Sequence, residues 1–221
     1  MKQLLQALRA RRLSHLAVVN LRILLGFAFV PAGLKKVLRQ PFTDPQNTGP
    51  FHDFLHAFFA TGVFYPFVGA VQLVIAVLLM TQTFAPLGAA LALPVMVCIT
   101  AFCWSTGVVP TAVVTTLMLC GTLALLVWDV ERFGPLLRPE GSGPPEVATA
   151  TAAVKEPPAV DTALWRACGT AILGFYGLTC LLHGGVYRPK GVDYGAPAFY
   201  VLLLLPLFPL VTLFLEQRRR S

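Results

Sequence analysis

The chain has 221 residues, of which 56% are hydrophobic and 12% are charged, and its formal net charge is +7. Soluble proteins carry about 25% charged residues on average, so this composition excludes an ordinary soluble domain. Because the basic residues flank long apolar blocks, we attribute the positive charge to membrane orientation and not to nucleic-acid binding.

Six apolar blocks are long enough to cross a bilayer as helices, which takes roughly 17–25 residues. The blocks are continuous instead of alternating, and backbone groups in lipid must be paired within the chain, so we expect helices and not a barrel. The predicted fold is an all-α membrane protein: a four-helix transmembrane bundle, a C-terminal transmembrane helical hairpin, and a short amphipathic helix in the first outer loop. The six predicted spans cover residues 16–34, 64–81, 84–104, 111–128, 164–182 and 197–215.

Composition divides the chain into four parts. Residues 1–15 are basic and amphipathic, which indicates a helix on the membrane surface. Residues 16–132 hold the four-helix bundle, and residues 133–162 are rich in Pro, Gly and Ala, which predicts a flexible linker. Residues 163–221 hold the hairpin and a basic tail, and two prolines are expected to bend the second helix of that hairpin.

Basic residues are distributed unevenly between the two sides of the predicted membrane. With a cytoplasmic N-terminus, eleven lysines and arginines fall on the inner side and five on the outer side, while Arg22 lies within the first span. The positive-inside rule therefore predicts that both termini are cytoplasmic. Because Arg22 interrupts the first apolar block, we expect that block to be retained and not cleaved as a signal peptide.

Arg22 and Asp129 need partners within the membrane, because a charge at the centre of a span costs about 2.5–3.5 kcal/mol on insertion scales. Thr115, Thr122 and Asp129 are spaced by seven and share one face of the fourth span. Arg22 enters from the same side as Asp129 and can extend back toward it. We predict an ion pair that either fixes helix register or binds an anionic or quinone headgroup; the remaining alternative is that Arg22 faces lipid phosphate.

Gln72 lies on the second span in line with Gly69 and Ala76. Its amide would hydrogen-bond a neighbouring helix or, alternatively, contact a ligand. All five cysteines lie in predicted spans and none forms a CxxC pair. Small buried side chains explain them better than a redox pair between helices.

Three stretches carry a family pattern: the first span reads LRILLGFAFVPAGLKKV, the second contains FVGAVQLVIAVLLM, and the fourth ends in LLVWDVERF. They resemble the DoxX-like and DoxD-like membrane proteins over roughly residues 16–133. The resemblance implies a four-helix bundle in a prokaryotic cytoplasmic (inner) membrane, associated with quinone-linked sulfur oxidation or other membrane redox systems. Gln72 stands where many relatives carry glutamate, which removes a titratable group from the membrane. The residues that match the first-helix pattern are Arg22, Gly26, Gly33 and Lys35.

The first outer loop contains H-D-F-L-H, which is one methylene short of the H-E-x-x-H zinc motif. Asp53 is shorter than the glutamate of that motif. A catalytic zinc site also needs a third protein ligand, for which Asp44 and His183 are the candidates. We therefore predict no metal site, and His52 and His56 are left as packing or ligand-contact residues.

A short amphipathic helix explains the same stretch. Asn47 or Thr48 is expected to cap it, Pro50 to begin it and Gly62 to end it. The two histidines fall on the polar side. The helix would lie on the outer membrane surface or cover the outer mouth of the bundle near Lys35 as a ligand-binding lid. Its apolar face comprises Phe51, Phe54, Leu55, Phe58 and Phe59.

Three functions remain open from the sequence. The first is a non-catalytic or quinone-binding accessory subunit of a membrane redox system, the second is a membrane scaffold or assembly protein, and a small-solute or lipid transporter ranks third. No haem, flavin or iron–sulfur motif is evident, so quinone is the one cofactor considered and an enzyme is not predicted. Expected partners are membrane lipids and a membrane or redox protein; the oligomeric state is not fixed. The candidate ligand-binding residues are Arg22, Lys35, His52, His56, Gln72 and Asp129.

Overall fold

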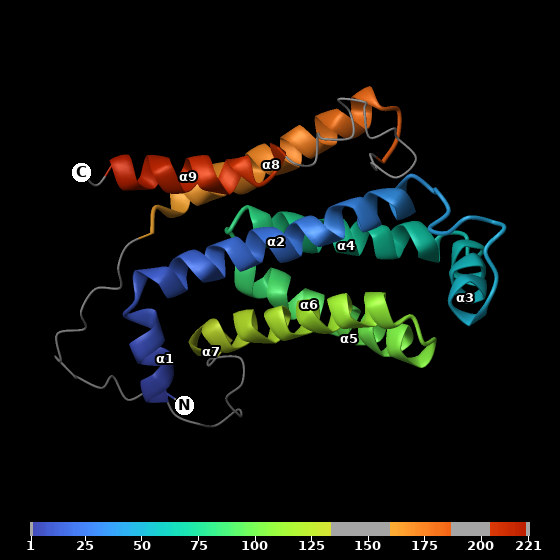
Figure 1. Ribbon diagram of the computed structural model, residues 1–221, viewed down its shortest axis with the longest axis horizontal. Helices are drawn as coiled ribbons and strands as arrows, with labels where there is room; N and C mark the ends of the chain where they lie inside the picture. Colours follow the sequence, from blue (N-terminus) through green and yellow to red (C-terminus); the bar gives the residue numbers. More distant parts are fainter. Residues whose placement is uncertain (1, 134–159, 187–203, 220–221) are drawn as a thin grey trace, which may run out of the picture.

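The computed structural model describes residues 2–133, 160–186 and 204–219, and within these it consists of helices without strands (Figure 1). This confirms the all-α prediction. Most of the predicted linker and the start of the predicted sixth span lie outside the described residues. The helices are α1 Lys2–Arg9, α2 Arg12–Val37, α3 Pro50–Phe59, α4 Phe64–Met80, α5 Ala85–Ser105, α6 Val109–Trp128, α7 Val130–Phe133, α8 Thr162–Leu182 and α9 Leu207–Arg218.

Within the described residues, four helices are long and apolar enough to cross a membrane: α2, α5, α6 and α8. With 17 residues, α4 reaches the required length only together with α3, from which it is bent by 97°. The six-span count is not confirmed, because the described part of the sixth block is α9, which has 12 residues. The helix begins directly after Pro206 and carries Pro209 in its first turn, where a missing backbone N–H is tolerated. The two prolines thus stand at the start of α9 instead of bending its middle.

Glycines allow α2 and α4 to pack closely. A Cβ atom added to Gly33 would lie 2.9 Å from the carbonyl oxygen of Gly69, and one added to Gly69 would lie 2.7 Å from that of Gly33. Near the other end of the same pair, a Cβ atom on Gly26 would lie 2.6 Å from Cγ of Met80. Small residues at such positions let two helix backbones approach within the membrane.

The hairpin of α8 and α9 packs on the same bundle. A Cβ atom on Gly169 of α8 would lie only 1.9 Å from the carbonyl oxygen of Met80 at the end of α4, so the two backbones are in direct contact. Trp165 Nε1 donates to Glu216 Oε2 across the hairpin at 2.8 Å, and Arg12 of α2 lies 3.3 Å from Glu216 Oε1. Glu216 is 1% exposed, so this carboxylate joins α2, α8 and α9 inside the protein.

Charged residues gather at one end of the helices, which we call the polar end. It holds α1, the start of α2, α7, the start of α8 and the end of α9, whereas α3 lies across the opposite end (Figure 1). Ion pairs join these segments: Arg9 with Glu131 at 2.6 Å, and Arg219 with Asp161 at 2.8 Å. The described ends of the chain therefore lie at the same end of the bundle (Figure 1).

Candidate functional site

An ion pair between α2 and the C-terminal end of α6 lies at the polar end. Arg22 Nη2 is 2.6 Å from Asp129 Oδ2, and the two side chains are 11% and 4% exposed. Thr115 and Thr122 are buried on the same face of α6 as Asp129. The predicted partnership between Arg22 and Asp129 is present in the structure.

Gln82 completes this cluster and was not found by sequence reasoning. Its Oε1 accepts a hydrogen bond from Arg22 Nη1 at 3.2 Å, and its Nε2 donates to the carbonyl oxygen of Val19 at 3.4 Å. Gln82 lies in the turn between α4 and α5 with φ of 59°, a left-handed conformation that is uncommon for residues other than glycine. One sequence feature could have indicated this contact: Gln82 lies in a turn on the same side of the membrane as Arg22.

A second buried polar pair lies toward the α3 end. Lys36 Nζ donates to Gln72 Oε1 at 3.0 Å and to the carbonyl oxygen of Ala32 at 3.2 Å. The ammonium also lies 4.5 Å from the ring centroid of Phe42. The close approach of α2 and α4 at their glycines brings these two side chains together. Lys36, and not the neighbouring Lys35, is the lysine that meets Gln72; Lys35 Nζ donates to the carbonyl oxygen of Pro41 at 2.8 Å.

The two histidines of α3 face the preceding loop. His52 Nδ1 shares a hydrogen bond of 2.6 Å with the Thr43 hydroxyl, and His56 Nε2 donates to the carbonyl oxygen of Asp44 at 3.2 Å. Both contacts hold the loop against α3. Within the described part of the chain, no three His, Cys, Asp or Glu side chains gather as they would around a metal ion.

The aromatic face of α3 packs on the bundle as the predicted amphipathic helix would. The rings of Phe51 and Phe54 lie 5.3 and 4.4 Å from that of Phe102 on α5, centroid to centroid. The predicted cap at Asn47 or Thr48 is wrong: Gly49, with φ of 108°, precedes the first helical residue and no side chain caps the helix. Asn47 instead donates its side-chain amide to the Thr43 hydroxyl.

The six candidate residues thus fall into separate places. Arg22 and Asp129 meet at the polar end, and Gln72 meets Lys36 toward the α3 end. Lys35, His52 and His56 bind the loop between α2 and α3. The structure therefore does not assemble the six into one site.

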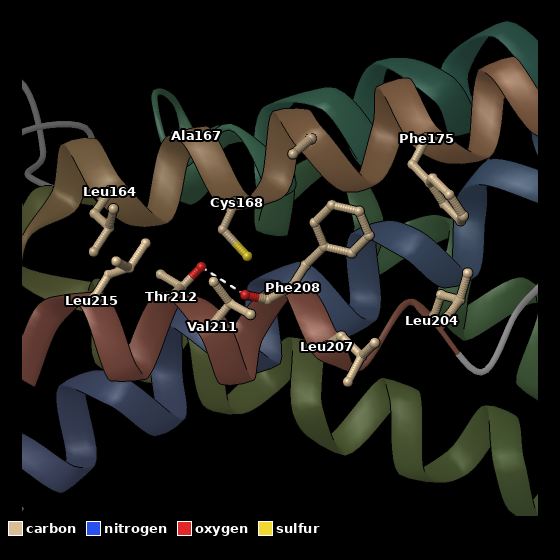
Figure 2. A pocket seen from close by; sticks show the side chains of 11 residues that line it. Leu164, Ala167, Cys168, Phe175, Leu204, Leu207, Phe208, Val211, Thr212 and Leu215 are labelled. Atoms are coloured by element: carbon tan, nitrogen blue, oxygen red, sulfur yellow. Dashed lines mark hydrogen bonds between the residues drawn. The ribbon is translucent and has the colours of Figure 1, made fainter.

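An apolar groove of about 470 Å³ lies between α8 and α9. Figure 2 shows side chains of both helices pointing toward each other across it, with Leu164 and Leu215 at one end and Phe175 and Leu204 at the other. The lining side chains that carry a polar atom are those of Cys168 and Thr212, and the Thr212 hydroxyl donates to the carbonyl oxygen of Phe208 at 2.7 Å. The sequence did not predict this groove, because the groove depends on how α8 and α9 pair.

A quinone fits this groove only in part. An apolar tail matches the lining, but a quinone carbonyl needs a hydrogen-bond donor. The hydroxyl of Thr212 is already used within α9, and a thiol such as that of Cys168 is a weak donor. The groove therefore lacks the strong donor that a quinone headgroup requires.

Comparison with known proteins gives one match. The model of the family described as DoxX matches residues 17–105, which contain most of α2 and all of α3, α4 and α5. Asp129 and the α8–α9 hairpin lie beyond the matched segment. No curated protein and no solved structure matches the chain. The match supports the DoxX resemblance read from the first two spans, whereas the fourth-span ending LLVWDVERF lies beyond it; residues 17–105 are thus similar to the DoxX family, and several described helices are apolar enough to cross a membrane.

Proposed function

We propose that the protein is a non-catalytic accessory subunit of a membrane redox system, holding a partner oxidoreductase in the bilayer. One observation supports the non-catalytic role: the charged side chains buried within the DoxX-matched segment and at the end of α6 are bonded to other side chains of the protein. Arg22 is held by Asp129 and Gln82, and Lys36 contacts Gln72. These groups join helices to one another.

The redox association comes from the DoxX family resemblance, and the structure is compatible with it. Many of the large apolar side chains on the outside of α4, α5 and α6 are about half exposed or more, such as Val77, Val97 and Leu117. Such a surface can face lipid or a membrane partner. A prokaryotic cytoplasmic membrane with both termini inside is part of this proposal and agrees with the eleven-to-five distribution of basic residues.

The test begins with the native membrane. The tagged full-length protein is cross-linked, extracted in mild detergent and analysed for partners and bound quinone. Support would be a membrane oxidoreductase in stoichiometric amount, together with slower electron transfer to quinone in membranes from cells that lack the chain. A partner without redox activity would favour the scaffold alternative and overturn the redox assignment.

A double variant separates structural from ligand-binding roles of the buried charges. Arg22→Met with Asp129→Leu removes the ion pair and replaces it with apolar side chains of similar size, which is often neutral for stability. If the pair joins helices only, the double variant restores electron transfer in the deletion strain as well as the wild type does. Failure to restore it despite normal expression and partner binding would assign Arg22 to a ligand.

A further inference from the structure

We propose that the groove between α8 and α9 binds one acyl chain of an anionic phospholipid, with the lipid phosphate held by Arg218 and Arg219. This proposal does not depend on the accessory role described above. It rests on the lining of the groove, the charges at its end, and the depth of that end in the membrane.

The lining is suited to a hydrocarbon chain. Leu207 and Val211 of α9 line the groove and are 49% and 54% exposed. The protein therefore leaves apolar surface uncovered inside a concave site, and the volume of about 470 Å³ is in the range of small-molecule sites. An acyl chain laid along the groove would cover this surface.

The groove ends in positive charge at the polar end. Leu215 is the last lining residue of α9, and Arg218 and Arg219 follow one helical turn later on the same face. On the facing helix, Asp161 stands one turn before Leu164 and pairs with Arg219 at 2.8 Å. With the nearby Arg12–Glu216 pair included, three guanidinium groups and two carboxylates leave this end net positive. Guanidinium groups bind phosphate oxygens with strong, oriented hydrogen bonds.

The mouth also lies at the depth where phosphates are found. Asp161 immediately precedes α8, whose 21 residues are apolar enough to cross the membrane. The residues just before such a helix stand at the headgroup layer, with the groove continuing into the hydrocarbon layer. Basic residues at this level attract anionic lipids.

The assay is native mass spectrometry of the full-length protein in mild detergent. It is titrated with phosphatidylglycerol, with phosphatidylcholine of the same chains, and with ubiquinone. We expect phosphatidylglycerol to bind at least about tenfold more tightly than phosphatidylcholine, as one charge-assisted hydrogen bond to phosphate would give. Equal binding of the two lipids would overturn the proposal.

Two sets of variants locate the lipid. Ala171→Phe fills the groove and should weaken phosphatidylglycerol binding about tenfold. This is the loss of affinity expected when a few methylene groups of the acyl chain are no longer buried in the groove. The matched control is Gly177→Phe, because a Cβ atom at Gly177 meets nothing within 4 Å. If both variants bind the lipid as the wild type does, the groove is not the site. Ubiquinone that displaces the lipid and is itself excluded by Ala171→Phe would overturn the proposal in favour of a quinone tail.

The headgroup contact is tested separately and leaves the groove unfilled. Arg218→Gln with Arg219→Gln should abolish the preference for phosphatidylglycerol. Asp161→Asn breaks the same ion pair but keeps both guanidinium groups, so it should retain or increase the preference. A preference that survives in the double arginine variant would refute the assigned phosphate contact.

Discussion

The ion pair between Arg22 and Asp129 gives the sharpest test of how this bundle is held together. Arg22→Met and Asp129→Leu each leave one charge buried without its partner, since the two side chains are 11% and 4% exposed. Breaking a buried pair on one side costs about 3–5 kcal/mol, because the remaining charge has lost its compensation. For a chain of this size, each kcal/mol lowers the melting temperature by roughly 2–4 °C, so a fall of about 6–20 °C is expected for each single variant.

The double variant is expected to be more stable than either single variant. Removing both charges removes the desolvation penalty together with the attraction, and Met and Leu fill similar space. The coupling in the double-mutant cycle should therefore exceed about 2 kcal/mol, well beyond the 0.3–0.5 kcal/mol within which independent sites add. The assay is thermal unfolding of purified protein in one detergent, followed by circular dichroism.

Arg132 supplies the internal control. It also contacts Asp129, at 3.6 Å, but its side chain is 68% exposed. An exposed pair contributes about 0–1 kcal/mol, so Arg132→Gln should shift the melting temperature by only a few degrees. If Arg22→Met shifts it no more than Arg132→Gln does, or if the cycle is additive, the buried pair does not stabilise the bundle.

Three further variants test other contacts by the same melting assay. Gly169→Ala should cost about 1–3 kcal/mol, because its Cβ atom would overlap a carbonyl oxygen of α4. Gly177→Ala, on an open face, should gain about 0.5–1 kcal/mol of helix stability; equal effects would refute the close contact. Gln72→Leu removes the side-chain acceptor that Lys36 contacts and should cost about 1–3 kcal/mol of stability. Gln72→Glu keeps an acceptor at this position and should retain the contact. A Glu variant no more stable than the Leu variant would argue against a stabilising Lys36–Gln72 hydrogen bond. The backbone hydrogen bond at the start of α8 holds the pKa of Asp161 below its ordinary value. The folded state therefore binds that proton less readily than the unfolded chain, and the stabilisation is present above about pH 4 and lost as the pH falls further. The difference in melting temperature between wild type and Asp161→Asn should accordingly shrink below about pH 4; a difference independent of pH would contradict this.

The sequence was sufficient for contacts that depend on membrane depth and helix face. Arg22 and Asp129 could be paired because both lie near the same membrane side, and the threonines spaced by seven showed which face of α6 is buried. The amphipathic helix α3 was predictable for a similar reason, because its aromatic residues and its histidines fall on opposite faces.

Other contacts depend on tertiary geometry that a sequence pattern does not contain. Lys35 and Lys36 are separated by 100° around one helix, and only the pairing of α2 with α4 decides which of them meets Gln72. Gln82 reaches Arg22 because its turn adopts a left-handed backbone, which the sequence did not suggest. The count of six spans is not confirmed at α9, because the described helix begins after Pro206 and the start of the apolar block lies outside the described residues.

The backbone contact at Gly169 affects how the protein unfolds. Its helix, α8, lies outside the segment that matches the DoxX family, yet its backbone touches the end of α4 without the width of a side chain between them. If these two parts of the chain were only in loose contact, side chains would separate their backbones and the parts could unfold one after the other. Because of this close contact and the Glu216 carboxylate shared among three helices, we expect α8, α9 and the DoxX-matched segment to unfold as a single cooperative unit.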